Sequence, residues 1–388
     1  MTCRVAIVGV GPAGVCCAYF LQDKFDVTLF DFGEPLKTIL PTGGGRCNLS
    51  YAEYDFKEFA TNYPRGEKFL YSVFSKFQTA DTQNLFENLG VETYIQDDLR
   101  IFPKTNSSKF VQEKFLQAIK SCKIRKEKVE SIKKSQNLFF INNKYEFEKV
   151  VVAIGGHSNF NLIKNLGHNI VTPKSSLVGL VSKVDFSELQ GVSMKAVETV
   201  AKFKEKTYSV KDDLIFTKDG ISGPMPYKVS SIFAREDYSN ENPIELNLKL
   251  ISDSLNMQKL LEENSKKDIK TLVSTFVPKS FANYFLKKLM INPELKCYEI
   301  NSKIRDEIFY NLNNFNILII GHDKKGEVVM SGGVDLVEVD NKTMQSKLVK
   351  DLFFCGEVLD IDGFCGGFNL QNCWSSAYVA ACGIMENV

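Results

Sequence analysis

The stretch that decides the fold is RVAIVGVGPAG, residues 4–14. Its first five residues form a short run rich in β-branched side chains, which is typical of a strand buried on both faces. A glycine-rich turn follows and leads into an apolar stretch through Leu21 that predicts a helix. A second strand is expected over residues 26–30, and it leads directly into Asp31. The order of strand, glycine turn, helix and strand favours a parallel α/β fold.

The turn has the spacing Gly-x-Gly-x-x-Gly, which is the fingerprint of Rossmann-type dinucleotide binding. Gly9 permits the tight turn, Gly11 lets the backbone approach a pyrophosphate, and Gly14 lets the helix pack closely on the strand. The pyrophosphate then lies on the helix N-terminus, beside Pro12 and Ala13. Asp31 follows Gly9 by 22 positions, close to the spacing of an acid that binds a ribose hydroxyl.

A secretory signal peptide over residues 6–21 is the competing interpretation of this apolar segment. Only Arg4 supplies charge before it, Pro12 interrupts it, and no Ala-x-Ala cleavage site follows. The sequence therefore favours the dinucleotide-binding interpretation.

Composition limits the partners that we expect. The chain has 388 residues, enough for two to three domains, and its 48 Lys and Arg balance 47 Asp and Glu. This balance predicts no nucleic-acid or membrane partner, and no apolar run approaches the length of a membrane span. Ten cysteines without a Cys-x-x-Cys pair, and three histidines, predict free thiols, no metal site and a cytoplasmic location. The oligomeric state stays open.

Three further segments look like parts of a binding site. Residues 41–48 read PTGGGRCN, a loop whose glycine N–H groups can turn toward an anion or carbonyl while Arg46 adds positive charge. Residues 150–156 read VVVAIGG, a strand that ends in glycines and resembles the Ala-Thr-Gly strand of FAD proteins shaped like glutathione reductase. Residues 352–371 combine a strand, the pair Gly356-Glu357, a glycine loop and a helix expected to open near Asn369.

Several motifs occur in order along the chain: GGGRCN at 43–48, RIFP at 100–103, FTKDGISGP at 216–224, SGGV at 331–334 and TMQSK at 343–347. Together with the C-terminal run, they resemble the bacterial NAD(P)/FAD-dependent oxidoreductase family of aminoacetone-oxidase-like and 3-dehydro-bile-acid-reductase-like flavoproteins. The resemblance covers nearly the whole chain. It implies an α/β fold with a split, Rossmann-like FAD-binding domain (1–172 and 322–388), an inserted β-barrel (173–252) and a helical subdomain (253–321).

The resemblance also implies FAD as the cofactor and a set of residues that hold it. Asp31 is expected on the adenosine ribose, Val129 on the adenine through its backbone, and Glu357 on the ribityl hydroxyls. The full predicted cofactor site is Gly9, Gly11, Pro12, Ala13, Gly14, Asp31, Gly44, Gly45, Arg46, Cys47, Asn48, Val129, Gly155, Gly356, Glu357, Gly366, Gly367, Phe368, Asn369 and Leu370.

This chain departs from the family pattern in two places that bear on the shape of the substrate. The loop after Gly156 is shortened, and Asn372 stands where the family commonly has an aromatic residue.

The expected function is an FAD-dependent oxidoreductase that acts on a small molecule. Reduction of an enone-like C=C bond, with NADH or NADPH as a transient donor, is the leading hypothesis, and oxidation of a small amine by oxygen is the first alternative. A flavin-bearing RNA-modification or RNA-binding protein and a thiol-based redox sensor are alternatives from other classes. The single glycine fingerprint disfavours a second, dedicated nicotinamide domain.

The sequence nominates no catalytic acid or base. A packing role is favoured for Cys47, because neither a second thiol nor a histidine stands near it in the sequence. Lys266-Lys267 and Lys287-Lys288 are expected to be solvated faces of helices.

Overall fold

The computed structural model describes residues 2–323 and 329–386, and it divides into two compact units. Unit 1 comprises Met1–Lys174 and Val329–Val388, and unit 2 comprises Ser175–Val328. Unit 1 is thus assembled from both ends of the chain, as expected for a split FAD-binding domain.

A parallel sheet of five strands forms the centre of unit 1, in the order β19-β10-β1-β2-β6. Because β1 lies in the middle, its residues are largely buried, and Val8 aligns with Val152 on one side and with Phe30 on the other. The expected strands at 4–8, 26–30 and 150–152 are all present. The bounds are β1 (Arg4–Val8), β2 (Asp26–Asp31), β6 (Lys123–Lys126), β10 (Lys149–Val152) and β19 (Leu352–Phe354).

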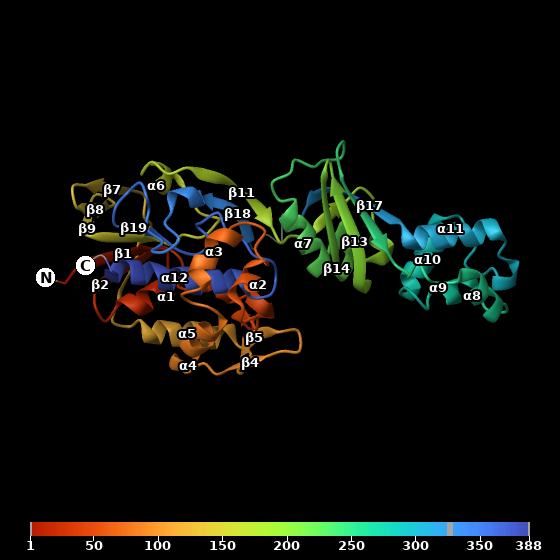
Figure 1. Cartoon of the computed structure of the whole chain (residues 1–388), viewed down its shortest axis with the longest axis horizontal. Coiled ribbons are helices and arrows are strands. Elements are labelled where there is room, and N and C mark those ends of the chain that lie inside the picture. Colours follow the sequence, from red (N-terminus) through yellow and green to blue (C-terminus); the bar gives the residue numbers. More distant parts are fainter. Residues whose placement is uncertain (1, 324–328, 387–388) are drawn as a thin grey trace. The chain divides into compact units, whose positions relative to one another are not determined.

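Two helices from opposite ends of the chain pack beside this sheet: α1 (Pro12–Leu21) and α12 (Phe368–Glu386) lie against each other (Figure 1). Trp374 of α12 is fully buried, and its indole donates to the Leu49 carbonyl (3.0 Å). The other helices of unit 1 are α2 (Phe56–Ala60), α3 (Glu67–Phe74), α4 (Thr79–Asn88), α5 (Ser108–Ala118) and α6 (Asn161–Lys164).

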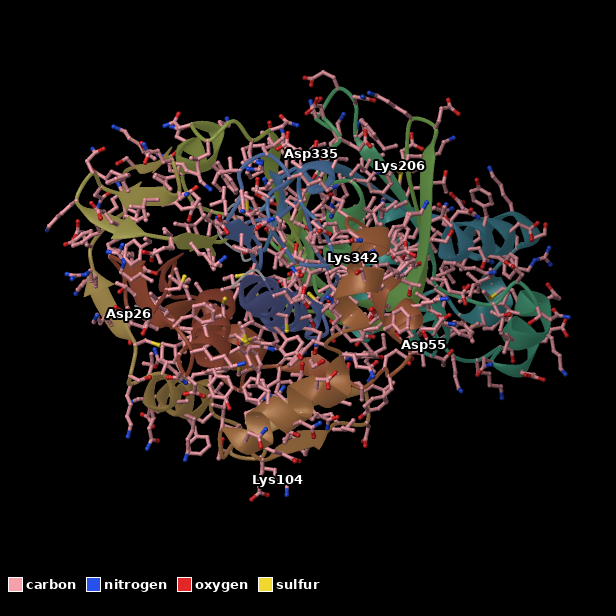
Figure 2. All side chains as sticks on the ribbon, turned by 60° about the vertical axis from the view of Figure 1, so that its left-hand side comes forward. Asp26, Asp55, Lys104, Lys206, Asp335 and Lys342 are labelled. Carbon is pink, nitrogen blue, oxygen red and sulfur yellow. The ribbon has the colours of Figure 1, made fainter. Side chains whose placement is uncertain are left out.

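Small sheets complete unit 1. β3 (Ser50–Tyr51), β5 (Arg100–Pro103) and β4 (Thr93–Ile95) form one, and β7 (Ile132–Ser135), β8 (Leu138–Ile141) and β9 (Tyr145–Phe147) form another. β11 (Ile170–Ser176) pairs with β18 (Val329–Val334). Charged side chains cover the surface; Lys104, for example, projects outward (Figure 2) and pairs with Glu92 at 2.7 Å.

Unit 2 contains a closed barrel in the order β12-β15-β14-β13-β16-β17. The sequence-based end of the barrel at residue 252 is wrong for one strand, since β17 closes the barrel after the helices. The strands are β12 (Leu180–Ser182), β13 (Ser193–Phe203), β14 (Lys206–Thr217), β15 (Gly220–Ser222), β16 (Ile244–Lys249) and β17 (Phe315–His322).

The helices of unit 2 are α7 (Pro224–Ile232), α8 (Met257–Glu263), α9 (Ile269–Val273), α10 (Lys279–Lys288) and α11 (Ser302–Asn313). Asn256 caps α8 by accepting from the Lys259 N–H (3.0 Å), and Asn301 caps α11 through the Ile304 N–H (2.9 Å). The expected α/β class, inserted barrel and helical region are therefore confirmed. Across residues 2–323 and 329–386, no helix combines the length and apolar character that crossing a membrane requires.

Candidate cofactor site and active site

The glycine turn after β1 has the tight geometry that the sequence predicts. Gly9 has φ +107°, and its N–H donates to the Phe30 carbonyl (2.9 Å). A Cβ on Gly14 would lie 2.0 Å from the Gly9 carbonyl oxygen, so only glycine lets α1 approach the turn this closely. By contrast, a Cβ on Gly11 would meet nothing nearer than Thr38 Oγ1 at 4.0 Å. The backbone at Gly11 therefore borders open space.

Asp31 lies at the carboxyl end of β2, and its carboxylate accepts hydrogen bonds from the backbone of the glycine turn and of the segment after β2. One carboxylate oxygen accepts from the Val10 N–H (2.8 Å) and the other from the Gly33 N–H (3.0 Å). Because each carboxylate oxygen has a second lone pair, Asp31 keeps acceptor capacity for a hydroxyl group. The residue is thus held in place by the backbone around it.

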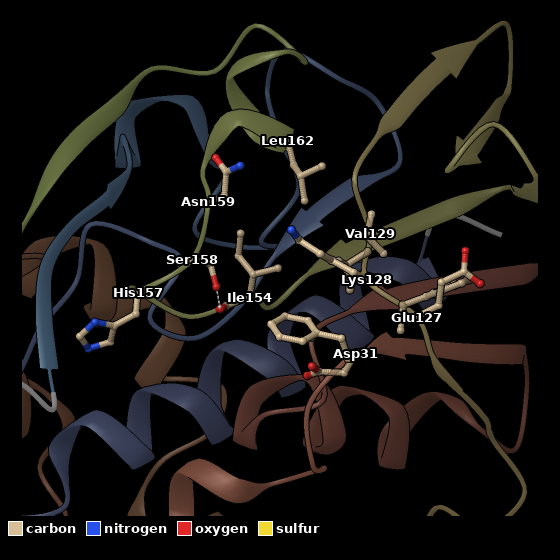
Figure 3. A pocket seen from close by; sticks show the side chains of 13 residues that line it. Asp31, Glu127, Lys128, Val129, Ile154, His157, Ser158, Asn159 and Leu162 are labelled. Atoms are coloured by element: carbon tan, nitrogen blue, oxygen red, sulfur yellow. Dashed lines mark hydrogen bonds between the residues drawn. The ribbon is translucent and has the colours of Figure 1, made fainter.

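A cavity of about 270 Å³ opens beside Asp31. Its walls come from the ends of β1 and β2, from the segment after β6 and from the segment after β10 (Figure 3). Gly9, Asp31 and Val129 all line it, so three predicted site residues far apart in the sequence lie together. Residues that the sequence did not nominate also contribute, namely Val8, Phe30, Phe32, Glu127, Lys128, Ile154, His157, Ser158, Asn159 and Leu162.

Most residues of the glycine loop at 43–48 have the left-handed backbone conformation, with positive φ. Gly43, Gly44 and Gly45 have φ of +58°, +68° and +84°, and Cys47 follows with φ +65°. The Arg46 guanidinium lies 4.2 Å from the ring centre of Phe102 and donates from Nε to the Gly43 carbonyl (3.1 Å). Stacking and hydrogen bonding therefore fix the orientation of this cation.

Arg46 has no carboxylate within ion-pair distance among the residues that the structure describes, and its side chain is only half-buried. Cys47 is fully buried, and this burial raises the pKa of its thiol to about 12. The thiol stays protonated at neutral pH, which agrees with the packing role expected for it.

Glu357, from the Gly-acid pair, reaches between two other segments of unit 1. Its Oε1 accepts from the Met330 N–H (2.9 Å), and the Gly156 N–H also bonds to the carboxylate. Although part of the side chain reaches solvent, burial of the carboxyl raises its pKa to about 7, against the opposing effect of those two N–H groups. A carboxyl held in this way is ready to accept a hydrogen bond from a ligand.

The start of α12 is fixed by contacts within the protein. Phe368 packs on Tyr51, Phe59 and Tyr63, with ring centres 5.0, 5.1 and 6.0 Å away, and its carbonyl accepts from the Tyr63 hydroxyl (2.6 Å). The Asn369 amide accepts from the Gly363 N–H (2.9 Å) and donates to the Gly363 carbonyl (2.8 Å). These two predicted site residues therefore use their side chains to shape the glycine loop.

A buried ion pair beside this loop was missed by the sequence analysis. Asp362 is fully buried, and its carboxylate oxygens accept from Nε and Nη2 of Arg65, which lies 297 positions earlier. The sequence offered a partial signal for Asp362, because this residue directly precedes the glycine loop. Arg65, however, lies in no recognisable motif.

The residues of unit 1 fit FAD on three observations. First, open space borders the backbone at Gly11, Gly44 and Gly155, where an added Cβ would meet at most one atom within 4 Å. Second, Asn48 Oδ1 is buried without a hydrogen-bond partner among the described residues. Third, the carboxylate of Glu357 has lone pairs left to accept a hydrogen bond from a hydroxyl group of a ligand. The cavity at Asp31 suits the adenosine part of FAD. The loop from Gly44 to Asn48 suits the polar edge of the flavin ring.

The fold and this arrangement together define a dinucleotide-binding protein of the Rossmann type, with candidate cofactor residues in both the first and the last segments of the chain. A family model described as the HI0933-like protein Rossmann domain matches residues 3–383. The chain belongs to this family, and it is an FAD-binding, flavin-dependent oxidoreductase.

Curated relatives match nearly the whole chain. The ribosomal RNA dihydrouridine synthase of Haemophilus influenzae is 26% identical over an alignment of 407 positions that covers 97% of each chain. The 3-dehydro-bile acid delta(4,6)-reductase of Clostridium scindens is 24% identical over an alignment of 403 positions that covers 97% of this chain and 98% of the relative. Among solved structures, the E. coli quinol fumarate reductase FrdA is 14% identical with a TM-score of 0.47, covering 100% of this chain and 70% of that chain.

Proposed function

We propose that this flavoprotein reduces a C=C bond conjugated to a carbonyl group, with NADH or NADPH as the electron donor. The names of both relatives support this reaction class. Dihydrouridine differs from uridine by two hydrogens across a ring C=C bond next to a carbonyl group. A delta(4,6) bond in a 3-dehydro (3-oxo) steroid is likewise conjugated to a ketone. Although the two substrates differ, the bond that is reduced has the same electronic character.

The observation that carries the proposal is the guanidinium of Arg46. Adding a hydride to the carbon β to a carbonyl places negative charge on the carbonyl oxygen. Arg46 is oriented by Phe102 and the Gly43 carbonyl, and no described carboxylate neutralises it. A fixed cation of this kind stabilises such an oxyanion. Oxidation of an amine to an imine, by contrast, creates no negative charge on the substrate.

The other site residues would hold the cofactor. Asp31 would accept from the adenosine ribose, the backbone at Gly11 to Gly14 would lie against the pyrophosphate, and Glu357 would accept from the ribityl chain. FAD bound there would supply the hydride transfer from NAD(P)H to the substrate carbon. The balanced reaction consumes one NAD(P)H and one proton, and forms two C–H bonds where the C=C bond stood.

Anaerobic mixing tests the proposal in two stages. In the first stage, NADH or NADPH should bleach the flavin absorbance of the holoenzyme. In the second stage, a 3-oxo-4-ene steroid, uridine or an unmodified ribosomal RNA transcript should restore that absorbance. The proposal would be replaced by the amine oxidase if none of these conjugated alkenes restored the flavin absorbance and aminoacetone reduced the oxidised enzyme.

Arg46→Gln sharpens the test. We expect the variant to keep its FAD and its bleaching by NAD(P)H, and to lose about 10²-fold in the rate of oxidation by the alkene. Arg46→Lys should recover part of that rate, because it restores the charge without the planar geometry. Equal rates in the wild type and in Arg46→Gln would remove Arg46 from the reaction.

A further inference from the structure

Positive charge is concentrated in one segment of unit 1, despite the balanced total of the chain. Residues 120–134 contain seven Lys or Arg and two Glu. Three of these basic residues, Lys123, Arg125 and Lys126, lie on β6, an edge strand of the central sheet whose four residues are all exposed. A sum over the whole chain averages this local excess away.

Few carboxylates neutralise the segment. Lys123 pairs with Asp26 at 3.1 Å, at the edge of unit 1 where Figure 2 labels Asp26. The carboxylate of Glu127 is occupied by hydrogen bonds from Asn142 and from the Tyr145 hydroxyl, both at 3.0 Å. The Arg125 guanidinium lies 4.5 Å from the ring centre of Tyr145. An aromatic ring is thus combined with cations on this surface.

A groove of about 890 Å³ borders the same segment. Its walls contain three lysines and no carboxylate: Ser131, Ile132, Lys133, Lys134, Asn165, Leu166, Leu348, Val349 and Lys350. The Lys134 ammonium donates to the Lys350 carbonyl and lies 3.8 Å from the carboxylate of Asp351. Neither Lys133 nor Lys350 has an ion-pair partner within the described part of the chain. A depression lined by charges of one sign concentrates the electrostatic potential.

We propose that this basic face, defined as residues 120–134 together with Lys350, binds the phosphate backbone of an RNA substrate. The inference rests on the proposed function and deepens it, since it makes uridine in a structured RNA the conjugated alkene. Its cations are spread over β6, β7 and the groove and do not converge on one point. That distribution suits a series of phosphates along a strand better than a single small anion.

Protection of an exposed edge strand against aggregation is the simpler explanation for charges on β6. It also covers Lys133, because β7 is an edge strand of its own three-stranded sheet. It does not account for Lys350, which lies on neither edge strand and lines the groove with Lys133 and Lys134. The expectation of no nucleic-acid partner came from the balanced net charge and from the view that the sequence contains no basic stripe. Residues 120–134 are a basic segment that this view overlooked.

The test is direct binding of unmodified ribosomal RNA transcripts to the FAD-loaded protein, measured by fluorescence anisotropy over a range of salt concentrations. The double variant Lys133→Glu and Lys350→Glu should lose at least about 10-fold in affinity at about 100 mM salt, and its salt slope should fall by about two. The matched control is Lys266→Glu with Lys267→Glu, which makes the same charge change on exposed lysines of unit 2. The control should lose much less.

FAD content and the rate of bleaching by NADPH should be unchanged in both double variants, which shows that they fold. Wild-type affinity and salt slope in the Lys133 and Lys350 variant would overturn the inference. A raised KM for NADPH with unchanged RNA affinity would also overturn it, since the groove would then serve the electron donor.

The two proposals can fail separately. If RNA binds to the basic face but no conjugated alkene oxidises the reduced enzyme, the proposed reaction fails and the RNA surface stands. If a steroid or free uridine oxidises the reduced enzyme while charge reversal leaves RNA affinity intact, only the RNA surface fails.

Discussion

Unit 1 and unit 2 bury different kinds of polar group. Among the described residues of unit 2, the buried polar side chains are all hydroxyls: Ser176, Ser182, Thr199, Ser230 and Ser231. Unit 1 buries a lysine, a histidine, an aspartate and several amides as well. Burying charges and amides costs free energy unless each finds a partner, so proteins restrict it to places where a site or a specific arrangement needs it. The buried charges and amides therefore lie in the same unit as the candidate cofactor site.

The same contrast appears around α12. Gln371 Oε1 accepts from the hydroxyls of Ser50 (2.6 Å) and Thr82 (2.9 Å), and its Nε2 donates to Ser375 Oγ (2.9 Å). In the barrel, by comparison, Phe216 packs on Phe186 and on Phe281 of α10, with ring centres 5.0 and 5.7 Å away. Unit 1 therefore depends on directional bonds that single substitutions can break.

The largest effect is expected at the buried ion pair. Replacing Asp362 by Ala removes the carboxylate that holds Arg65, whose side chain is only 13% exposed. A buried pair that loses one partner costs about 3–5 kcal/mol. The measurement is urea unfolding followed by the fluorescence of Trp374, which is the one tryptophan of the chain and reports unit 1.

The matched control for Asp362 is Glu92→Gln, which breaks the exposed pair with Lys104 in the same unit. We expect no measurable change there, because exposed pairs contribute little. Equal effects of the two substitutions would contradict the view that unit 1 depends on its buried charges.

Substitutions at two glycines of the first turn should affect different quantities: one the free energy of unfolding, the other the affinity for FAD. In Gly14→Ala the new methyl would lie 2.0 Å from a backbone oxygen, so α1 must shift from β1 and unfolding should become easier by about 1–3 kcal/mol. In Gly11→Ala the methyl enters open space, so the stability of the FAD-free protein should hardly change. Its FAD dissociation constant should rise by roughly tenfold, about 1.4 kcal/mol, because the backbone can no longer approach the pyrophosphate.

Urea unfolding of the FAD-free variants and fluorescence titration with FAD measure the two quantities. If Gly11→Ala binds FAD as the wild type does, the pyrophosphate does not lie against this turn.

Local patterns made the first turn predictable, and long-range pairing explains what was missed. The strand period, the glycine spacing and the position of Asp31 are all contained within residues 4–31. Nothing in the sequence of β17 says that it pairs with β12 and β16 of the barrel, since about 60 residues of helical segment precede it. Likewise, a glycine loop before a helix predicts a site, but the side-chain direction of Phe368 is decided by Tyr63, far away in sequence.

Glu357 links FAD binding to pH. Burial raises its pKa to about 7, so near neutral pH the carboxyl of the FAD-free protein is partly protonated. A hydroxyl that donates to it requires the carboxylate, and binding therefore releases a proton. FAD affinity should rise with pH by at most about tenfold per unit below pH 7 and level off above it. Titrations of the FAD-free protein between pH 5.5 and 8.5 measure this slope.

Glu357→Gln should bind FAD more weakly at high pH and show no such slope, whereas Glu92→Gln serves as a control at an exposed carboxylate of unit 1. Falling affinity with rising pH in the wild type would mean that the protonated carboxyl donates to the ligand.

The smallest expected effect is at His168, whose buried ring bridges Glu338 (2.9 Å from Nδ1) and the hydroxyl of Ser346 (2.9 Å from Nε2). Burial lowers the pKa of His168 below its usual 6.5, although Glu338 opposes this shift. The unfolded chain therefore takes up a proton before the folded chain does. It follows that the stability contributed by the neutral ring is complete above pH 6.5 and is lost as the pH falls.

His168→Gln keeps a polar group without this titration, so its free energy of unfolding should depend less steeply on pH between 7.5 and 5.5, as followed by Trp374. Parallel pH profiles for the two proteins would show that the Glu338 contact cancels the effect of burial.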